Sequence, residues 1–252
     1  MASRGWVAGS PAEAGAAAHV FVDDLDQPEL GGEDRHHLQR VLRLRPGELV
    51  TASDGHGGWR SCRYAGVERL DVAAEIDHCP QPAPAITIAF ALTKGDRPEW
   101  TVQKLVEAGV NRMVPMVTQR TVVRWEGEKG ARQGARLNAV ARAAAMQSRQ
   151  AWLPVVTDVQ PFGATAQPGV GVAMAQLGGG PLDLGRPTVL IGPEGGWDES
   201  ELACGLPSVG LGPTVLRAET AALAAGLLLA ALRAGTVRPG GGAVGGGGGG
   251  GG

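Results

Sequence analysis

The segment TVLIGPEGGWDESELACGLPSVGLGPTVLRAETAALAA, residues 188–225, places two glycine-bearing turns after two short apolar runs. The first run, residues 188–191, has the length and apolar character of a buried strand, and the turn GPEGG at 192–196 follows it. The second run, residues 208–211, meets a Gly-Pro turn at 212–213, and an Ala/Leu-rich helix begins shortly afterwards. Open α/β sheets usually bind ligands where such turns follow the carboxyl ends of strands. We therefore expect the two turns to lie side by side at the ends of neighbouring strands.

The composition of the first turn indicates what kind of ligand it suits. Its glycine spacing, G-x-x-G-G, matches neither the dinucleotide fingerprint nor the phosphate-binding P-loop. Asp198 and Glu201 have the spacing of a capping box, which predicts a helix start after the turn. Three carboxylates, Glu194, Asp198 and Glu199, surround this helix start and would repel a phosphate. A neutral or cationic cofactor with a flat base suits the turn better, and S-adenosylmethionine, which carries a sulfonium, is such a molecule. A tight strand-to-helix turn, with glycines present only for backbone geometry, stays open as the alternative.

Two motifs in this segment give the chain a specific resemblance. GPEGGW at 192–197 and LGPTVLRAETAA at 211–222 resemble the C-terminal motifs of the RsmE family, which are 16S ribosomal RNA uridine-N3 methyltransferases of the knotted SPOUT class. The resemblance implies that the chain methylates N3 of uridine 1498, in the usual ribosomal RNA numbering, with S-adenosylmethionine as cofactor. Three upstream segments extend it over most of the chain: 36–48, 91–110 and 143–149.

The resemblance also implies which residues form the active site. Arg217 is expected to stabilise charge that develops on the uracil oxygens, or to orient the base, and Glu219 is a possible proton acceptor. An ion pair between Glu219 and Arg217, or a role for Glu219 in starting the last helix, is the structural alternative. The cofactor is expected to contact the two turns and the strands before them at Ala173, Ile191, Gly192, Glu194, Gly195, Gly196, Leu211, Gly212 and Leu216.

Basic residues gather in two zones although the formal net charge of the chain is −2. Residues 35–69 hold seven arginines against three acidic residues, and residues 94–149 hold eleven basic residues against five acidic ones. Such zones suit a protein that touches phosphate on one face, although arginines that only solvate helix surfaces would give the same pattern. The expected RNA contacts are Arg40, Arg43, Arg45, Arg60, Lys94, Arg97 and Arg149.

A proline-rich stretch, CPQPAP at 79–84, divides the chain into two units. Residues 19–80 contain several short strands and, by resemblance, form a PUA-like RNA-binding domain. Residues 84–236 alternate strands and helices, which predicts a mostly parallel sheet covered by helices, here of the knotted SPOUT type by resemblance. Residues 1–18 are expected to be a disordered leader, and the glycine-rich residues 237–252 a flexible tail. The predicted class is α/β with a small β-rich N-terminal domain.

Three local expectations concern side chains of the larger unit. The helix that starts near Asp96 is expected to turn Trp100, Leu105 and Val106 toward the core. A strand at 169–174 should end before a loop that contains Gly178, Gly179 and Gly180. Residues 221–232 are apolar on all sides, so this helix should be buried on more than one side. A homodimer through this helix, or a monomer that packs it internally, would satisfy the pattern.

The remaining features limit the function classes. Cys62, Cys79 and Cys204 lie far apart and no Cys/His cluster is present, so we expect no disulfide, no metal and a reducing, cytoplasmic setting. No apolar run reaches transmembrane length, so no membrane partner is expected. Two alternatives remain: a SPOUT methyltransferase that acts on another RNA, and a non-catalytic RNA-binding ribosome assembly factor that needs no cofactor.

Overall fold

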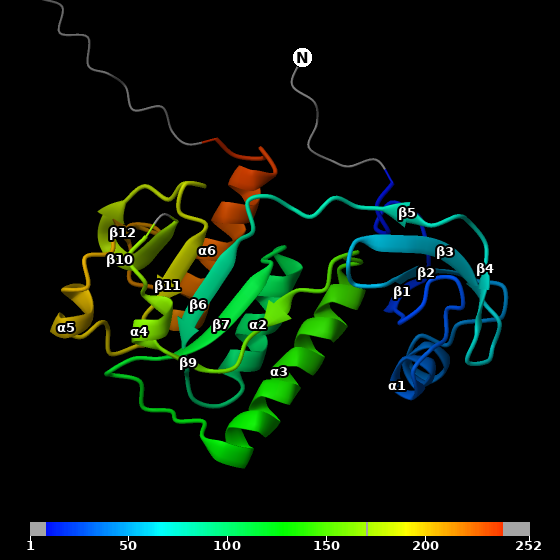
Figure 1. Cartoon of the computed structure of the whole chain (residues 1–252), viewed down its shortest axis with the longest axis horizontal. Helices are drawn as coiled ribbons and strands as arrows, with labels where there is room; N and C mark the ends of the chain where they lie inside the picture. Colours follow the sequence, from blue (N-terminus) through cyan, green and yellow to red (C-terminus); the bar gives the residue numbers. More distant parts are fainter. Residues whose placement is uncertain (1–8, 170, 239–252) are drawn as a thin grey trace, which may run out of the picture.

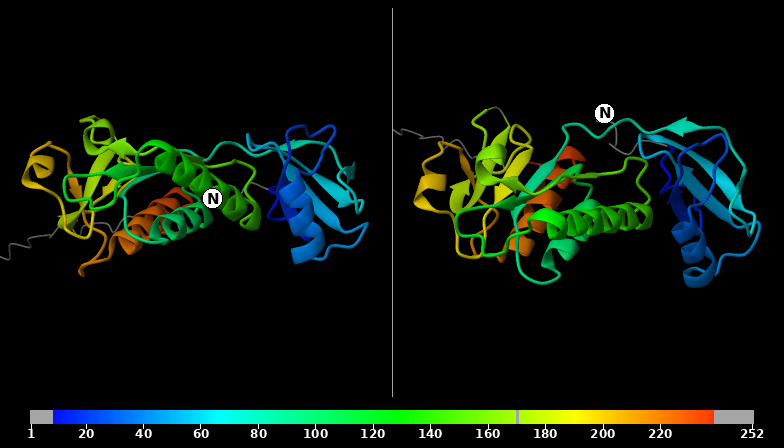
Figure 2. Two further views of the ribbon diagram at one scale, coloured as in Figure 1. Left: turned by 90° about the horizontal axis from the view of Figure 1, so that it is seen from below. Right: turned by 60° about the horizontal axis from the view of Figure 1, so that its bottom comes forward.

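The computed structural model describes residues 9–169 and 171–238, and within these residues the strands form one five-stranded and one seven-stranded sheet (Figure 1). The smaller sheet belongs to the N-terminal unit and the larger to the C-terminal unit. Figure 2 shows the two units at opposite ends of an elongated molecule, joined by the chain between β5 and β6 and by helix α3. This arrangement confirms the predicted α/β class with a β-rich N-terminal domain.

The N-terminal unit is a mixed sheet closed on one side by a short helix. Strand β1 pairs parallel with β2, and β3 pairs antiparallel with β2, β4 and β5. Helix α1 continues directly into the π-helical turn η1, and Leu38 of this turn is fully buried against the sheet. The elements are β1 (Ala18–Phe21), α1 (Gly32–His36), η1 (His37–Val41), β2 (Leu49–Ser53), β3 (Gly58–Tyr64), β4 (Leu70–Val72) and β5 (Asp77–His78).

The described part of the expected leader is folded, which corrects the prediction of disorder up to residue 18. Ala16 is buried, the backbone N–H of Ala17 donates to the carbonyl of Leu49 at 2.8 Å, and β1 already begins at Ala18. Residues 1–8 lie outside the described residues. The same holds for residues 239–252, which make up most of the expected glycine tail.

The C-terminal unit is a parallel sheet with strand order β12-β10-β11-β6-β7-β8, and β9 also pairs with β7. All of its pairings are parallel, as the alternation of strands and helices predicted. Its elements are β6 (Thr87–Ala91), α2 (Arg97–Glu107), β7 (Arg112–Val117), α3 (Gly127–Gln147), β8 (Val155–Val156), β9 (Gln160–Pro161), α4 (Phe162–Thr165), β10 (Val172–Gly180), β11 (Thr188–Ile191), α5 (Glu199–Leu202), β12 (Ser208–Val209) and α6 (Ala218–Arg233).

Alternate residues of the central strands build two cores, one on each face of this sheet. Ile88 and Phe90 of β6 join the large cluster with α2, α3 and α6, whereas Ala89 joins a smaller cluster with Leu190 and Trp197. This is the alternation that a strand buried on both faces requires. The sheet is therefore covered on both sides, and its free carboxyl edge is the place where a site can form.

Strand β10 lies between β11 and β12, which corrects the expectation that the two glycine turns follow neighbouring strands. The sequence Gly178-Gly179-Gly180 belongs to β10 rather than to a loop. At Gly179 there is no room for a side chain, because a Cβ there would lie 2.5 Å from the backbone carbon of Val209. The chain leaves β12 at the edge of the sheet and returns to α6, which packs on α2, β6 and β11.

Helices α2 and α6 pack closely through a glycine. A Cβ at Gly226 would lie 2.8 Å from Leu105 Cδ2 and 2.9 Å from Val110 Cγ2, so these two side chains pack directly against the backbone of α6. Leu105 and Val106 of α2 are buried as expected, but Trp100 is 40% exposed and does not enter the core. The fully buried residues of α6 lie along one side of the helix, so the expectation that it is buried on more than one side is wrong.

Residues 150–153, just after α3, are held by the N-terminal unit. The carbonyl of Ala151 accepts hydrogen bonds from Gly57 N–H (3.1 Å) and the Ser53 hydroxyl (2.8 Å), and Leu153 N–H donates to the carbonyl of Gly55 at 2.9 Å. The Trp152 indole N–H donates to the carbonyl of Cys79 at 2.9 Å. These bonds insert the segment beside the β2–β3 hairpin and tie the two units together.

A buried histidine adds a further bond between the units. His19 Nε2 lies 3.0 Å from the carbonyl oxygen of Gln150, which can only accept, so Nε2 carries the proton. The other ring nitrogen, Nδ1, then accepts from the Thr51 hydroxyl at 2.9 Å. Burial lowers the pKa of His19 to about 4, although the hydrogen bond to Gln150 opposes this shift. The ring is therefore neutral near pH 7 and holds both units as a neutral linker.

Candidate active site

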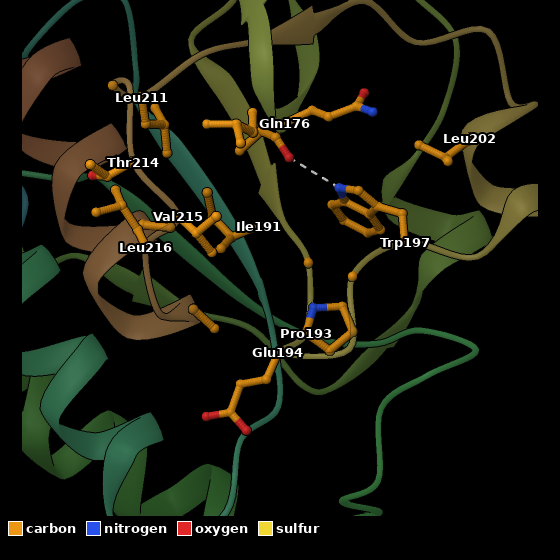
Figure 3. Close-up of a pocket in the computed structure, with 17 residues that line it drawn as sticks. Gln176, Ile191, Pro193, Glu194, Trp197, Leu202, Leu211, Thr214, Val215 and Leu216 are labelled. Carbon is orange, nitrogen blue, oxygen red and sulfur yellow. Dashed lines mark hydrogen bonds between the residues drawn. The ribbon is translucent and has the colours of Figure 1, made fainter.

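A cavity of about 400 Å³ opens at the carboxyl ends of β10, β11 and β12 (Figure 3). Its volume lies within the range of small-molecule sites. The two glycine turns form opposite sides of it, and a bulge in β10 forms the third. Its lining consists of Ala175, Gln176, Leu177, Ile191, Gly192, Pro193, Glu194, Gly196, Trp197, Leu202, Leu211, Gly212, Thr214, Val215, Leu216, Ala218 and Ala221.

The wall from β10 exists because that strand bulges. Both Ala175 and Gly180 pair with Val209, so the four residues between them leave the regular ladder. Two of them, Gln176 and Leu177, line the cavity, and Leu177 is 59% exposed. The bulge thus turns a strand end into a pocket wall, which the pattern of glycines alone did not reveal.

The turn after β11 is shaped by a tryptophan that rests on a glycine. A Cβ at Gly192 would lie 2.9 Å from Cε2 of Trp197, so no larger residue fits beneath the ring. The indole N–H of Trp197 donates to the carbonyl of Ala175 at 3.0 Å, the bond drawn in Figure 3. Gly196 has φ 72°, a left-handed conformation that favours glycine. The turn, the ring and the β10 wall therefore form one fixed unit.

A second layer supports this turn from outside. Glu201 is buried, and its carboxylate accepts backbone hydrogen bonds from Gln119 at 2.8 Å and from Asp198 at 2.9 Å. Arg120 donates to the carbonyl of Gly195 at 3.1 Å and lies 3.5 Å from the Asp198 carboxylate. Hydrogen bonds from Ser200 hold the pKa of Asp198 below its usual value. The capping box predicted for Asp198 and Glu201 is confirmed.

Most residues expected to contact a cofactor line this cavity, and two do not. Ala173 is fully buried in the core of the sheet, so the prediction for it is wrong, and Ala175 occupies the wall two residues later. Gly195 faces outward, where a Cβ would lie 3.6 Å from Arg120 Cβ. The other seven lie along the cavity: Ile191, Gly192, Glu194, Gly196, Leu211, Gly212 and Leu216.

Sequence reasoning missed several lining residues, most of all Trp197, Thr214 and Val215. Trp197 directly follows the GPEGG turn, and its position within the quoted motif was the available signal. Val215 is 84% exposed at the rim, although the sequence places it in an apolar run. Exposure of this kind depends on the tertiary path of the chain, which local pattern does not encode.

Three charged residues, Arg97, Glu194 and Glu219, lie close together at the edge of the cavity. Arg97, the first residue of α2, forms an ion pair with Glu194, and its Nε lies 3.8 Å from Oε1 of Glu219. Figure 3 shows that the Glu194 side chain points away from the cavity. Arg97 was predicted to contact RNA, but both of its partners are carboxylates of this site. The partner of Glu219 is thus Arg97, and the alternative pairing with Arg217 is not present.

The two expected catalytic side chains differ in environment. Oε2 of Glu219 is buried, and it has no hydrogen-bond partner within the described residues. Arg217 caps the start of α6 and is exposed, and no carboxylate of the described residues lies within ion-pair distance of it. Neither side chain lines the cavity itself, but Leu216 and Ala218, which flank Arg217, do. Their catalytic roles stay predictions.

The remaining expected RNA contacts are distributed over both units. Arg40, Arg43 and Arg45 are exposed on or just after η1, and Lys94 is exposed in the turn before α2. Arg149 is half-buried, has φ 54°, and lines a second cavity of about 830 Å³ between α1/η1 and α3. These five residues stay predicted RNA contacts.

Arg60 is a correction to that set. It is 6% exposed, and its guanidinium donates to the carbonyl of Ala74 at 2.7 and 2.9 Å and to the carbonyl of Leu25 at 2.9 Å. A guanidinium that is buried and bonded to backbone carbonyls in this way has no surface to offer a phosphate. Arg60 therefore stabilises the N-terminal fold.

Other expectations about the site concern metals, membranes and disulfides. Across residues 9–169 and 171–238, no three His, Cys, Asp or Glu side chains gather as a metal site would require. In the same residues, every helix is too short or too polar to span a bilayer. Cys62, Cys79 and Cys204 are all free thiols.

Comparison with protein families and known structures assigns both units. Residues 80–230 match an RNA methyltransferase domain, and residues 30–77 match an RNA methyltransferase PUA domain. The chain belongs to the RsmE family. An RsmE relative, the ribosomal RNA small subunit methyltransferase E of Mycobacterium tuberculosis, is 32% identical over 235 residues, which cover 81% of this chain and 88% of the relative.

Solved RsmE-type structures share the fold. The ribosomal RNA small subunit methyltransferase E of Neisseria gonorrhoeae, bound to S-adenosyl methionine, matches with a TM-score of 0.72 and 26% identity, over 84% of this chain and 95% of that one. A putative methyltransferase of Legionella pneumophila, in complex with the same cofactor, matches with a TM-score of 0.74 and 25% identity, over 84% and 96%. The predicted SPOUT-type C-terminal unit and PUA-like N-terminal unit are confirmed.

Proposed function

We propose that this protein transfers a methyl group from S-adenosylmethionine to N3 of a single uridine in 16S ribosomal RNA of the small ribosomal subunit. The observation that carries the proposal is the cavity built jointly by the GPEGG turn, the LGPTVLR turn and the β10 bulge. Membership of the RsmE family supports the small-subunit RNA substrate. That the target is a uridine, and that its N3 atom is methylated, is our more specific proposal within this substrate class.

The chemistry of the lining suits this cofactor. Among the described residues that line the cavity, the single ionisable one is Glu194, whose side chain points away from the cavity, and the others are apolar or carry amide or hydroxyl groups. A site for a dinucleotide or a free phosphate would need cations or a helix start free of carboxylates. Apolar side chains such as Ile191, Leu211 and Leu216 offer surface to an adenine ring, and the exposed turn backbone offers hydrogen bonds to its edge. When bound, the cofactor supplies an electrophilic methyl group on a sulfonium.

Two side chains supply the chemistry on the RNA side. N3 of uracil carries a proton, which must leave before the nitrogen lone pair can attack a methyl carbon. Glu219 accepts this proton on Oε2, the oxygen that has no donor within the described residues. Arg217 stabilises the negative charge that then spreads onto the uracil oxygens. The proton passes from Glu219 to solvent after the nitrogen–carbon bond has formed.

The RNA is held by exposed basic residues of both units. Arg40, Arg43 and Arg45 on the PUA-like unit, with Lys94 and Arg149, contact phosphates around the target. The target base is splayed out of its surroundings to reach the cavity, as single-stranded RNA bases are when a protein reads them. The enzyme acts in the cytoplasm.

Helix α6 supports a homodimer. It exposes Leu227 (49%) and Leu228 (39%), whereas Gly226 packs against Leu105 of α2. An exposed apolar stripe on a helix that is buried along its other side suits a partner surface of the same kind, and two-fold dimers are the commonest oligomers.

The test is methyl transfer from labelled S-adenosylmethionine to small ribosomal subunits from a strain that lacks this enzyme, with naked 16S RNA in parallel. Nucleoside mass spectrometry should find N3-methyluridine at one site, formed much more slowly with Arg217→Ala and with Glu219→Gln. Methylation of another RNA would identify a different SPOUT substrate. If the protein neither transfers a methyl group nor binds the cofactor, the remaining function is that of a non-catalytic RNA-binding assembly factor.

A further inference from the structure

Arg97 connects the two halves of the proposed active site. Its guanidinium pairs with Glu194 of the turn after β11 through Nη1, and its Nε faces Oε1 of Glu219 on α6 at 3.8 Å. The guanidinium side chain is 36% exposed and the Glu219 side chain 14%, so the pairing lies at the edge of the site rather than on the open surface. One side chain of α2 thus spans the cofactor turn and the helix that carries the proposed base.

The two carboxylate oxygens of Glu219 have different surroundings. Oε1 faces the Arg97 guanidinium, whereas Oε2 is buried without a hydrogen-bond partner in the described residues. A buried acceptor without a donor costs free energy, on the order of 1–3 kcal/mol, unless another molecule supplies the donor. The N3–H of a uracil is a donor of the required kind.

The charges around Glu219 explain why a cation stands at this position. Glu194 comes from the turn after β11 and Glu219 from α6, and Arg97 from α2 pairs with both. Without the cation between them the two carboxylates would repel each other, and the Glu219 side chain would lose its anchor. Arg217 is the other charged residue near the start of α6, and it is exposed.

We propose that Arg97 is a positioning residue for the proposed methyl transfer, which holds Glu219 so that its Oε2 meets the N3–H of the target base. The inference rests on the proposed function. Arg97 touches neither the base nor the cofactor in this account; it fixes the carboxylate that accepts the proton. The planar guanidinium fork can serve two carboxylates at once, which a single ammonium does less well.

The test is a double-mutant cycle on the full-length enzyme, with Arg97→Met, Glu219→Gln and the combined variant. Single-turnover methyl transfer gives the rate of the chemical step, and calorimetry gives the affinity for S-adenosylmethionine. Arg97→Met should lower the rate about 100-fold, as expected when a general base is misplaced, and change cofactor affinity less than about threefold. In the Glu219→Gln background the same substitution should lower the rate less than about threefold.

Two further variants separate positioning from folding. Arg97→Lys keeps the charge without the fork and should recover part of the rate, about tenfold over Arg97→Met. Arg136→Met removes another arginine that pairs with α2, at 2.8 Å from Glu99, and should leave the rate unchanged. A melting temperature within a few degrees of wild type for Arg97→Met excludes loss of the fold.

The outcomes are distinct. An equal loss of rate from Arg97→Met in the wild-type and Glu219→Gln backgrounds would mean that Arg97 acts independently of Glu219, and the inference would be wrong. A loss confined to cofactor affinity would assign Arg97 to the cofactor turn and would also overturn it. Wild-type enzyme that transfers no methyl group to any RNA would instead overturn the proposed function, before any variant is compared.

Discussion

The indole ring of Trp197 covers Gly192 so closely that a methyl group on the glycine would lie 2.9 Å from the ring carbon Cε2. The same ring donates a hydrogen bond to Ala175 of the neighbouring wall. The shape of the cofactor turn therefore depends on one missing side chain and one large one. A change at either residue reaches both sides of the cavity.

Gly192→Ala is expected to weaken binding of S-adenosylmethionine about tenfold or more, because the added methyl displaces the indole or the turn, and such overpacking costs about 1–3 kcal/mol. Calorimetric titration measures the effect. Gly163→Ala is the matched control, since a Cβ at Gly163 meets no atom within 4 Å. Wild-type affinity in Gly192→Ala would show that the indole does not define the bound turn.

Arg60→Met is expected to destabilise the protein by about 3 kcal/mol, because the carbonyl of Ala74 and the buried carbonyl of Leu25 lose their donor. Chemical denaturation measures the loss. The affinity of the folded variant for RNA should match that of wild type. Arg45→Met, at an exposed position, should do the opposite and weaken RNA binding while the free energy of unfolding stays unchanged. A stable Arg60→Met variant with weak RNA binding would restore Arg60 to the RNA surface.

Protonation of His19 should lower the free energy of unfolding as the pH falls. Its pKa is about 4 in the folded protein and near 6.5 when unfolded, so the unfolded chain binds the extra proton first. His19 should therefore cost the fold about 2 kcal/mol between pH 7.5 and pH 5, and stop adding to the loss below pH 4. Urea unfolding at several pH values measures this slope. His19→Gln should remove that part of it, whereas His37→Gln, at an exposed position, should keep it.

Leu228→Asp is expected to convert a dimer into a monomer, because it places a charge in the exposed stripe of α6. Sedimentation velocity at micromolar concentration reads the mass directly. Val72→Asp, at a residue that is 46% exposed on the N-terminal unit, should leave the mass unchanged. A monomeric wild-type protein would contradict the proposed α6 interface.

Features of the fold that depend on residues close together in the sequence were predictable. The apolar run 188–191 and the GPEGG turn gave a buried strand and a site wall, because strand burial and glycine geometry are local properties. The capping residues Asp198 and Glu201 also matched, since both lie within one helical turn. The order of strands was not predictable from these signals, because β10 enters between β11 and β12 through contacts distant in sequence.

Single arginines were the least predictable residues. Arg60, Arg97 and Arg45 look alike in sequence, yet one is buried and binds backbone carbonyls, one binds two carboxylates and one is exposed. Which of these an arginine does depends on the groups that the fold brings near it. The prediction that Trp100 packs into the core is wrong for the same reason. An apolar side chain on a helix is buried only if the core extends to its position.

Because residues 150–153 bind to the N-terminal unit, the proline-rich linker at 79–84 does not separate two independent fragments. The backbone of residues 150–153 completes hydrogen bonds of Gly55 and Gly57, and the Trp152 ring fills the space beside Gly57. A fragment that starts after residue 84 would carry these residues with no partner, and a fragment that ends there would leave the β2–β3 hairpin open along one edge. The boundary drawn by sequence is thus no cleavage point, and the two units should melt in a single calorimetric transition.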